Sequence, residues 1–187
     1  MRRLFTILVV ALILAAGVFL TRGIGFTSRL RPLPFESTAS HAARRWATPP
    51  ALIAQANPVP SSDEVLKDAM AHWADHCATC HGNDGKGKTT IGGSLYPPAP
   101  DMQAAATQQM SDGELFYVIE RGIPLTGMPA WGNGTAEGER SSWALVRFIR
   151  RLPQLTAADL AAMEKMNPKS GADRDRERQI EEFLNAK

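Results

Sequence analysis

This chain of 187 residues has little cysteine, and its two cysteines, Cys77 and Cys80, stand three positions apart. A zinc module usually has a second, separated pair of ligands, which is missing here. The basic residues form no stripe with interleaved aromatic residues, so nothing supports nucleic-acid binding. Acids are scarce at the start, where residues 1–60 hold seven arginines against the single acid Glu36. The net charge of +2 therefore comes from this first part of the chain.

Both cysteines belong to the pentad Cys-Ala-Thr-Cys-His at residues 77–81. This spacing is typical of c-type haem attachment, in which two thiols bond to the porphyrin and the adjacent His81 reaches the iron. A thioredoxin-like dithiol also uses Cys-x-x-Cys, but no preceding strand or βαβ frame is indicated. A zinc site would need His81 to converge with a partner such as His72 or His76. We expect one covalent haem c, which leaves no cysteine for a lipoprotein anchor.

The segment Gly127-Met128-Pro129-Ala130-Trp131 is the candidate for a second iron ligand. A thioether is a soft, neutral ligand that raises the reduction potential and suits electron transfer. Pro129 favours an extended backbone at Met128, and the surrounding glycines indicate a loop. The other methionines lack this setting and are expected to fill the core. We therefore expect His81 and Met128 to be the two iron ligands.

The pentad, the following Gly-Asn-Asp-Gly-Lys-Gly at 82–87 and the segment 127–131 together resemble class I monohaem cytochromes c. Within that family the chain is most similar to the small c-type haem domains of respiratory oxidases and membrane dehydrogenases. The resemblance covers roughly residues 61–152. It implies an all-α fold, in which three core helices and their loops enclose one covalent haem.

The resemblance also implies a role for each matching residue. The two cysteines of the pentad would bind the haem covalently, with His81 as the proximal ligand and Met128 as the distal ligand. In this family a proline carbonyl commonly accepts the other N–H of the ligand histidine, which fixes its tautomer. Pro97 or Pro98 is the matching position, and the sequence does not decide between them.

Local patterns predict the same three helices without the resemblance. Residues 61–64 have the form of a capping box, and the apolar spacing after them predicts a helix that ends at the pentad. Residues 111–114 form a second capping box, which opens a short helix ending near Gly122. A third helix is expected over about 139–151. We expect two tryptophans, Trp73 and Trp143, to meet where the first and third helices cross.

These patterns divide the chain into four parts: a membrane anchor or signal peptide at 1–22, a Pro/Arg-rich linker at 23–60, the haem domain at 61–152 and a charged helical tail at 153–187. The linker contains one candidate helix at 37–47, and the tail contains a candidate helix that begins at Thr156.

The compartment depends on the apolar segment Leu4–Leu20, which follows two arginines. The small residues at 15–17 would suit cleavage of a signal peptide. An uncleaved single-pass anchor is favoured, because the segment is longer than a usual signal-peptide core and Arg22 can snorkel to the interface. Haem attachment to such a pentad requires export, as the resemblance implies. We expect the haem domain on the periplasmic or outer face of a bacterial cytoplasmic membrane.

The function expected is electron transfer by a membrane-anchored cytochrome, with redox proteins as partners and no small-molecule substrate. Two protein ligands leave no open iron position for catalysis, so the chain is not expected to be an enzyme. Two other functions stay open. The chain could be a non-catalytic haem subunit of a larger dehydrogenase or terminal oxidase. It could also be a gas or redox sensor, or a weak peroxidase, if Met128 leaves the iron.

Overall fold

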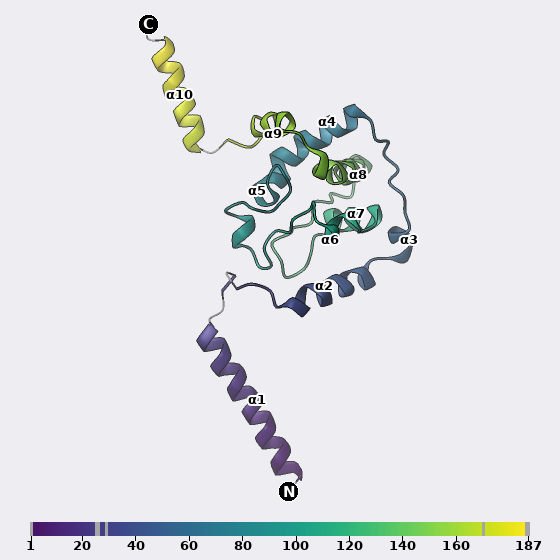
Figure 1. The fold of residues 1–187 in the computed structure, drawn as a ribbon, viewed down its shortest axis with the longest axis vertical. Helices are drawn as coiled ribbons and strands as arrows, with labels where there is room; N and C mark the ends of the chain where they lie inside the picture. The colour runs from purple at the N-terminus through teal and green to yellow at the C-terminus, as the bar shows by residue number, and fades with distance from the viewer. Residues whose placement is uncertain (1, 25–26, 29, 170, 186–187) are drawn as a thin grey trace. The chain divides into compact units, whose positions relative to one another are not determined.

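The computed structural model of the chain describes residues 2–24, 27–28, 30–169 and 171–185. Over these residues the protein is helical and contains no strand (Figure 1), which confirms the predicted all-α class. The chain divides into two compact units, Met1–Leu30 and Arg31–Lys187.

The first unit contains α1 (Arg2–Ile24), an apolar helix. Among the described helices it alone is long and apolar enough to cross a membrane, over Arg2–Gly23. Its two threonines, Thr6 and Thr21, donate hydroxyl hydrogen bonds to backbone carbonyl groups one turn earlier, at 3.0 and 2.9 Å. The helix therefore satisfies these polar groups internally. A membrane anchor and a signal sequence both fit its length and composition.

The second unit begins with α2 (Pro34–Ala47) and α3 (Pro50–Ile53). Each helix starts with proline, whose fixed φ suits the first helical position. The helix predicted at 37–47 therefore begins three residues earlier than expected. From Arg31 onward, the predicted linker belongs to the same compact unit as the haem domain.

The helix that carries the pentad consists of three consecutive parts. α4 (Asp63–His72) passes into the π-helical turn η1 (Trp73–Cys77), and this turn passes into α5 (Ala78–His81). The cap is Ser62, whose hydroxyl accepts a hydrogen bond from the Val65 amide at 3.3 Å. The capping box predicted at 61–64 is therefore wrong: the cap lies at Ser62, and the third helical residue, Val65, has no polar side chain to return the bond. The predicted end of the helix at the pentad is confirmed.

A loop with the short elements η2 (Gly92–Ser94) and α6 (Ala105–Gln108) leads to α7 (Asp112–Arg121). The predicted capping box at the start of α7 is present. The Ser111 hydroxyl accepts from the Glu114 amide at 3.2 Å, and the Glu114 carboxylate accepts from the Ser111 amide at 2.7 Å.

The chain ends with α8 (Ala136–Arg151), η3 (Leu152–Gln154), α9 (Ala157–Glu164) and α10 (Gly171–Asn185). α8 starts three residues before the predicted position, because Thr135 caps it through the Gly138 amide at 3.0 Å. The predicted start of α9 is confirmed, since Thr156 and Asp159 form a capping box.

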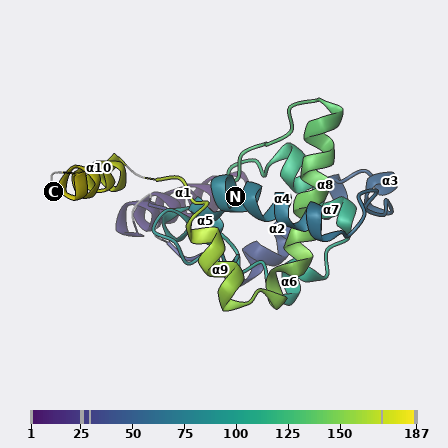
Figure 2. The ribbon, with the colours of Figure 1, turned by 90° about the horizontal axis from the view of Figure 1, so that it is seen from above.

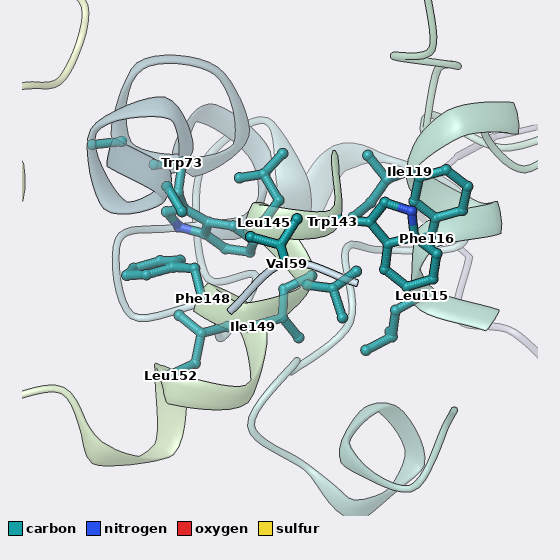
Figure 3. Close-up of a cluster of buried hydrophobic side chains, with 14 of the residues drawn as sticks. Val59, Trp73, Leu115, Phe116, Ile119, Trp143, Leu145, Phe148, Ile149 and Leu152 are labelled. Atoms are coloured by element: carbon teal, nitrogen blue, oxygen red, sulfur yellow. The ribbon is translucent and has the colours of Figure 1, made fainter. Parts of the chain in front are cut away.

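The core lies where α8 packs on both α4 and α7 (Figure 2). Trp73 of η1 lies against Phe148 of α8, with ring centroids 5.6 Å apart, and Phe116 of α7 stacks on Trp143 at 4.2 Å (Figure 3). The expected contact between Trp73 and Trp143 is therefore replaced by two separate aromatic pairs. Burial of each large side chain contributes roughly 1.5–3 kcal/mol, so these pairs hold the three helices together.

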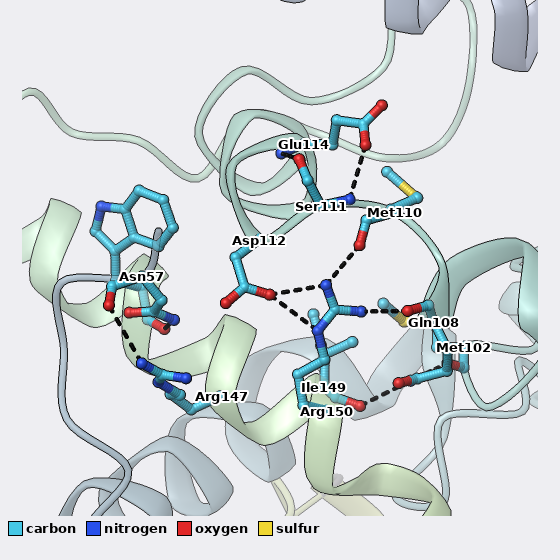
Figure 4. A network of polar contacts seen from close by, with 11 residues as sticks. Asn57, Met102, Gln108, Met110, Ser111, Asp112, Glu114, Arg147, Ile149 and Arg150 are labelled. Atoms are coloured by element: carbon cyan, nitrogen blue, oxygen red, sulfur yellow. Dashed lines mark hydrogen bonds and ion pairs between the residues drawn. The ribbon is translucent and has the colours of Figure 1, made fainter. Parts of the chain in front are cut away.

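Arg150 of α8 ties the loop before α7 to the core (Figure 4). Its guanidinium donates to the Asp112 carboxylate at 2.7 and 2.9 Å, and to the Gln108 carbonyl oxygen at 2.7 Å. The Met110 carbonyl oxygen accepts a further bond at 2.5 Å. One side chain thus satisfies both a carboxylate and two backbone acceptors, one at the C-terminal end of α6 and one in the loop after it.

Candidate haem site

The two cysteines and the histidine of the pentad lie at the end of one helix. Cys77 is the last residue of η1, while Cys80 and His81 belong to α5. Residues three and four positions apart lie on the same face of a helix. The two thiols and the imidazole are therefore presented on one side. Both cysteines are half-buried, and neither is in a disulfide.

His81 is in the chemical state that an iron ligand requires. Burial lowers the pKa of its imidazole below 6.5, so the neutral form prevails at neutral pH. Its ring lies 5.7 Å from that of Trp73, centroid to centroid. The Trp73 indole in turn donates to the Gly82 carbonyl oxygen at 3.0 Å. Trp73 therefore supports both the His81 ring and the backbone turn that follows it.

The second nitrogen of His81 is unusual, because Nδ1 is buried and has no hydrogen-bond partner. A buried polar atom without a partner costs roughly 1–3 kcal/mol. The expected partners Pro97 and Pro98 lie in the loop after the pentad with exposed side chains, and neither carbonyl accepts this bond in the structure. The prediction that one of them does so stays a prediction.

The thiol of Cys77 is protonated at neutral pH. Burial, with a smaller contribution from Cys80, raises its pKa to about 12. Such a thiol is a poor nucleophile for disulfide exchange, because the thiolate is the reactive form. A redox dithiol is therefore not favoured by the environment of Cys77.

Thr89 fastens the loop after the pentad onto α5. Its hydroxyl lies 2.9 Å from the Thr79 carbonyl oxygen and 3.0 Å from that of Cys80. The same hydroxyl accepts a hydrogen bond from the Gly92 amide at 2.8 Å. Thr89 thus bridges the pentad and η2. Sequence reasoning missed this residue, because a threonine in a polar loop has no spacing that marks it.

Gly92 allows this loop to approach the pentad closely. A Cβ atom at this position would lie 2.1 Å from the Cys80 carbonyl oxygen. Only glycine fits this contact without a shift of the backbone. The loop after the pentad is therefore shaped by a close backbone approach to one of the two haem-binding positions.

The Met128 loop connects α7 to α8, and it folds back on itself. The Ile123 amide donates to the Met128 carbonyl oxygen at 3.0 Å. The Trp131 amide donates to the Ile119 carbonyl oxygen at 3.0 Å, which ties the end of the loop to α7. Met128 itself is half-buried. These bonds hold the candidate ligand in a closed loop rather than in a free one.

The loop leaves α7 at Gly122, which has φ of +66°. A Cβ atom here would lie 2.7 Å from the Ala130 amide nitrogen. Glycine is needed here both for the positive φ and because the backbone of residues 128–130 passes so close to this position. The glycine that ends α7 is therefore also the base of the Met128 loop.

Two contacts bring the ligand segments together. His76 of η1 and Trp131 of the Met128 loop meet edge to face, with ring centroids 5.6 Å apart. Gly127 lies against the Leu95 side chain, so close that a Cβ atom there would be 2.6 Å from a Leu95 methyl carbon. The loop that carries Met128 therefore touches both η1, which leads into the pentad, and the loop that follows the pentad.

The arrangement fits a covalently bound haem. The two free thiols have the spacing of a c-type haem site, and the neutral imidazole of His81 follows them directly. The buried Nδ1 atom of His81 has no hydrogen-bond partner. Nitrogen and thioether ligands are those that iron takes in electron-transfer haem proteins. The cysteines and His81 are thus able to hold the group, and Met128 offers the second ligand.

Residues 64–149 match the family model described as cytochrome C oxidase, cbb3-type, subunit III. No curated protein matches the chain. The matched segment runs from α4 to α8 and includes both the pentad and the Met128 loop. Cys77 and Cys80 agree with the Cys-x-x-Cys-His motif of cytochromes c. Residues 64–149 therefore form a cytochrome c domain that belongs to the cbb3-type oxidase subunit III family.

Proposed function

We propose that the chain is a membrane-anchored electron carrier with one covalent haem, bound through Cys77 and Cys80 and ligated by His81 and Met128. The observation that carries the proposal is the buried imidazole of His81, whose Nδ1 has no hydrogen-bond partner, directly after two free thiols. The cytochrome c domain implies electron transfer with redox partners. When bound, the haem supplies one-electron chemistry.

The residues of the chain orient and insulate this group. The lowered pKa of His81 keeps the imidazole available as a ligand without loss of a proton at neutral pH. The closed Met128 loop would offer a thioether as the second ligand, which would leave no open iron position for small molecules. Trp73 packs against both the His81 ring and Phe148, and so excludes water on the core side of His81. Electrons would then enter and leave without a substrate binding to iron.

Absorption spectroscopy of the holoprotein tests the ligand set. We expect a low-spin spectrum, a weak ferric-iron-to-thioether band, and no reaction of the ferrous protein with carbon monoxide. Met128→Leu should abolish the band and allow carbon monoxide to bind, while Met102→Leu, a matched change at another half-buried methionine, should do neither. A carbon-monoxide-reactive wild type would refute ligation by Met128 and favour sensing or peroxidase chemistry.

One of the prolines, Pro97 or Pro98, is proposed to accept a hydrogen bond from His81 Nδ1 in the holoprotein. The proposal is supported by the buried and unpartnered state of that atom. In the NMR spectrum of the diamagnetic ferrous protein, the Nδ1 proton should exchange slowly and show a cross-peak to one of these prolines. Fast exchange of this proton with water would refute the bond.

The membrane side of the proposal rests on α1, which is long and apolar enough to span a bilayer. We propose that it stays uncleaved as a single-pass anchor in a bacterial cytoplasmic membrane, with the haem domain on the periplasmic side. The mass of the mature protein, isolated from membranes, decides this. Loss of the first 16 to 20 residues would identify a signal peptide instead, since the candidate cleavage site lies there.

A second function is favoured by the family match, which names a subunit of an oxidase. The chain would then pass electrons within a larger membrane enzyme as a non-catalytic haem subunit. Affinity purification in mild detergent separates the two functions. A stable complex with a large membrane protein would support the subunit, and a protein purified alone that exchanges electrons with several partners would support the free carrier.

A further inference from the structure

One face of α2, its inner face, is bonded to residues of the haem domain. The Tyr96 hydroxyl lies 2.8 Å from both carboxylate oxygens of Glu36. Near the other end, Arg45 donates to the Glu114 carboxylate at 2.7 Å. Thr48, directly after the helix, is buried. Contacts at both ends therefore hold α2 against the haem domain along its length.

The opposite face of α2 is apolar and exposed. Phe35 and Trp46 have 69% and 89% of their surface exposed. They stand eleven positions apart, which is three helical turns, so they lie on the same side. Ala39 and Ala42 occupy the positions between them and are also exposed. We call these four residues the outward face of α2.

The sequence position of α2 indicates what covers this face. Nine residues, and so ten Cα–Cα steps, separate Ile24, the end of α1, from Pro34, the start of α2. This segment reaches at most about 35 Å, and less in any folded conformation. If α1 spans a bilayer, α2 is therefore held close to the membrane surface. Tryptophan and phenylalanine are side chains that enter this interfacial region favourably.

The charges beside the outward face suit an anionic surface. Arg31 precedes the helix, and the Arg45 side chain on its flank is 63% exposed despite its bond to Glu114. Residues 22–60, on the same side of the proposed span as α2, hold five arginines and one acid. Each basic residue near a membrane with anionic lipid contributes about 1 kcal/mol of attraction. Apolar anchors with flanking arginines are the pattern of an interfacial helix.

We propose that the outward face of α2 lies in the headgroup region of a phospholipid bilayer that contains anionic lipid. The inference rests on the anchoring by α1 proposed above. Because α2 is bonded to the haem domain at both ends, its contact with lipid fixes the orientation of that domain on the membrane.

Spin labels on the full-length holoprotein test this proposal. In the holoprotein Cys77 and Cys80 are bonded to haem, so one added cysteine is the sole free thiol. Three variants are needed: Ala11→Cys in α1, Ala42→Cys on the outward face, and Glu139→Cys on the exposed start of α8 as the control. Each is reconstituted in vesicles of phosphatidylcholine and phosphatidylglycerol. Power saturation then compares collisions with oxygen, which enters lipid, and with a water-soluble nickel chelate.

The outcomes separate the inference from the anchoring. Labels at 11 and 42 that both meet oxygen severalfold more than nickel, with the label at 139 showing the reverse, support the proposal. A label at 11 in lipid with a label at 42 in water overturns it and leaves the anchor intact. A label at 42 that is shielded from both reagents indicates a protein contact and also overturns it. A label at 11 in water refutes the anchor and this inference together.

A second measurement tests whether Phe35 and Trp46, and not the spin label itself, hold the outward face in lipid. The double variant Phe35→Ser, Trp46→Ser, carrying the label at 42, should lose most of its contact with oxygen. The matched control is Leu125→Ser, which removes a fully exposed apolar side chain from the Met128 loop. The control should leave the label at 42 unchanged. Equal loss in both variants would refute the specific role of Phe35 and Trp46.

Discussion

The Thr126 hydroxyl accepts a hydrogen bond from the backbone amide of Met128 at 3.1 Å, and it donates one to the Ile123 carbonyl oxygen at 2.8 Å. A single side chain thus bonds the candidate iron ligand to the start of its own loop. The loop depends on this bridge because neither backbone group belongs to a regular helix.

Replacement of Thr126 should therefore weaken ligation by Met128. Thr126→Val keeps the shape of the side chain and removes both bonds, at a cost of about 1–2 kcal/mol in the closed loop. We expect the ferric protein to lose part of its thioether band and to bind added imidazole more tightly than the wild type. Thr126→Ser keeps the hydroxyl and should behave like the wild type. Equal imidazole affinities in all three proteins would contradict a positioning role.

Gly92 gives a second prediction. Gly92→Ala would place a methyl group 2.1 Å from the Cys80 carbonyl oxygen and displace the loop after the pentad. We expect a loss of more than about 2 kcal/mol in the free energy of unfolding, and a lower yield of protein with attached haem. Gly93→Ala is the matched control, because a Cβ atom there meets nothing within 4 Å. A normal haem yield in both variants would refute the tight approach at Gly92.

The parts of the site that the sequence predicted are those with local signals. The pentad and the capping boxes at 111–114 and 156–159 are readable because each depends on residues within three or four positions of one another. The bonds of Glu36 to Tyr96 and of Arg45 to Glu114 join residues more than fifty positions apart. No local pattern marks them, so the packing of α2 on the haem domain could not be predicted.

The predicted contact between Trp73 and Trp143 was wrong for a geometric reason. Trp143 and Phe148 stand five positions apart on α8, which places them about 140° apart around the helix. Phe148 faces Trp73 and Trp143 faces Phe116. The sequence shows that both residues are apolar and helical, but not which of the two neighbouring helices each one faces.

Arg150 is predicted to contribute far more stability than its neighbour Arg151. The Arg150 guanidinium bonds to Asp112 and to two backbone carbonyl groups, whereas Arg151 bonds to the Gln154 side chain at the surface. Arg150→Ala leaves several half-buried acceptors without a donor, so we expect a loss of about 2–3 kcal/mol. Arg151→Ala should cost less than about 0.5 kcal/mol. Denaturant unfolding of the two holoproteins measures the difference, and equal midpoints would contradict it.

The stability of the holoprotein should fall in mild acid. His72 of α4 lies 2.8 Å from the Ser141 hydroxyl. Burial and the neighbouring His76 lower the pKa of His72 below 6.5, against a smaller opposing effect of Asp75. Burial and the nearby Arg44 also lower the pKa of His41. Both groups therefore take up a proton more readily in the unfolded chain than in the folded one.

The sign of the pH dependence follows from this difference. Above pH 6.5 both states hold the neutral imidazole and the full stabilisation is present. As the pH falls below 6.5 toward the folded-state pKa values, the unfolded chain binds more protons and the free energy of unfolding declines. Denaturant midpoints measured between pH 7.5 and 5 should decrease in the wild type. They should decrease less in His72→Gln, which has no proton to gain at that position. An unchanged slope in this variant would show that His72 is not the group responsible.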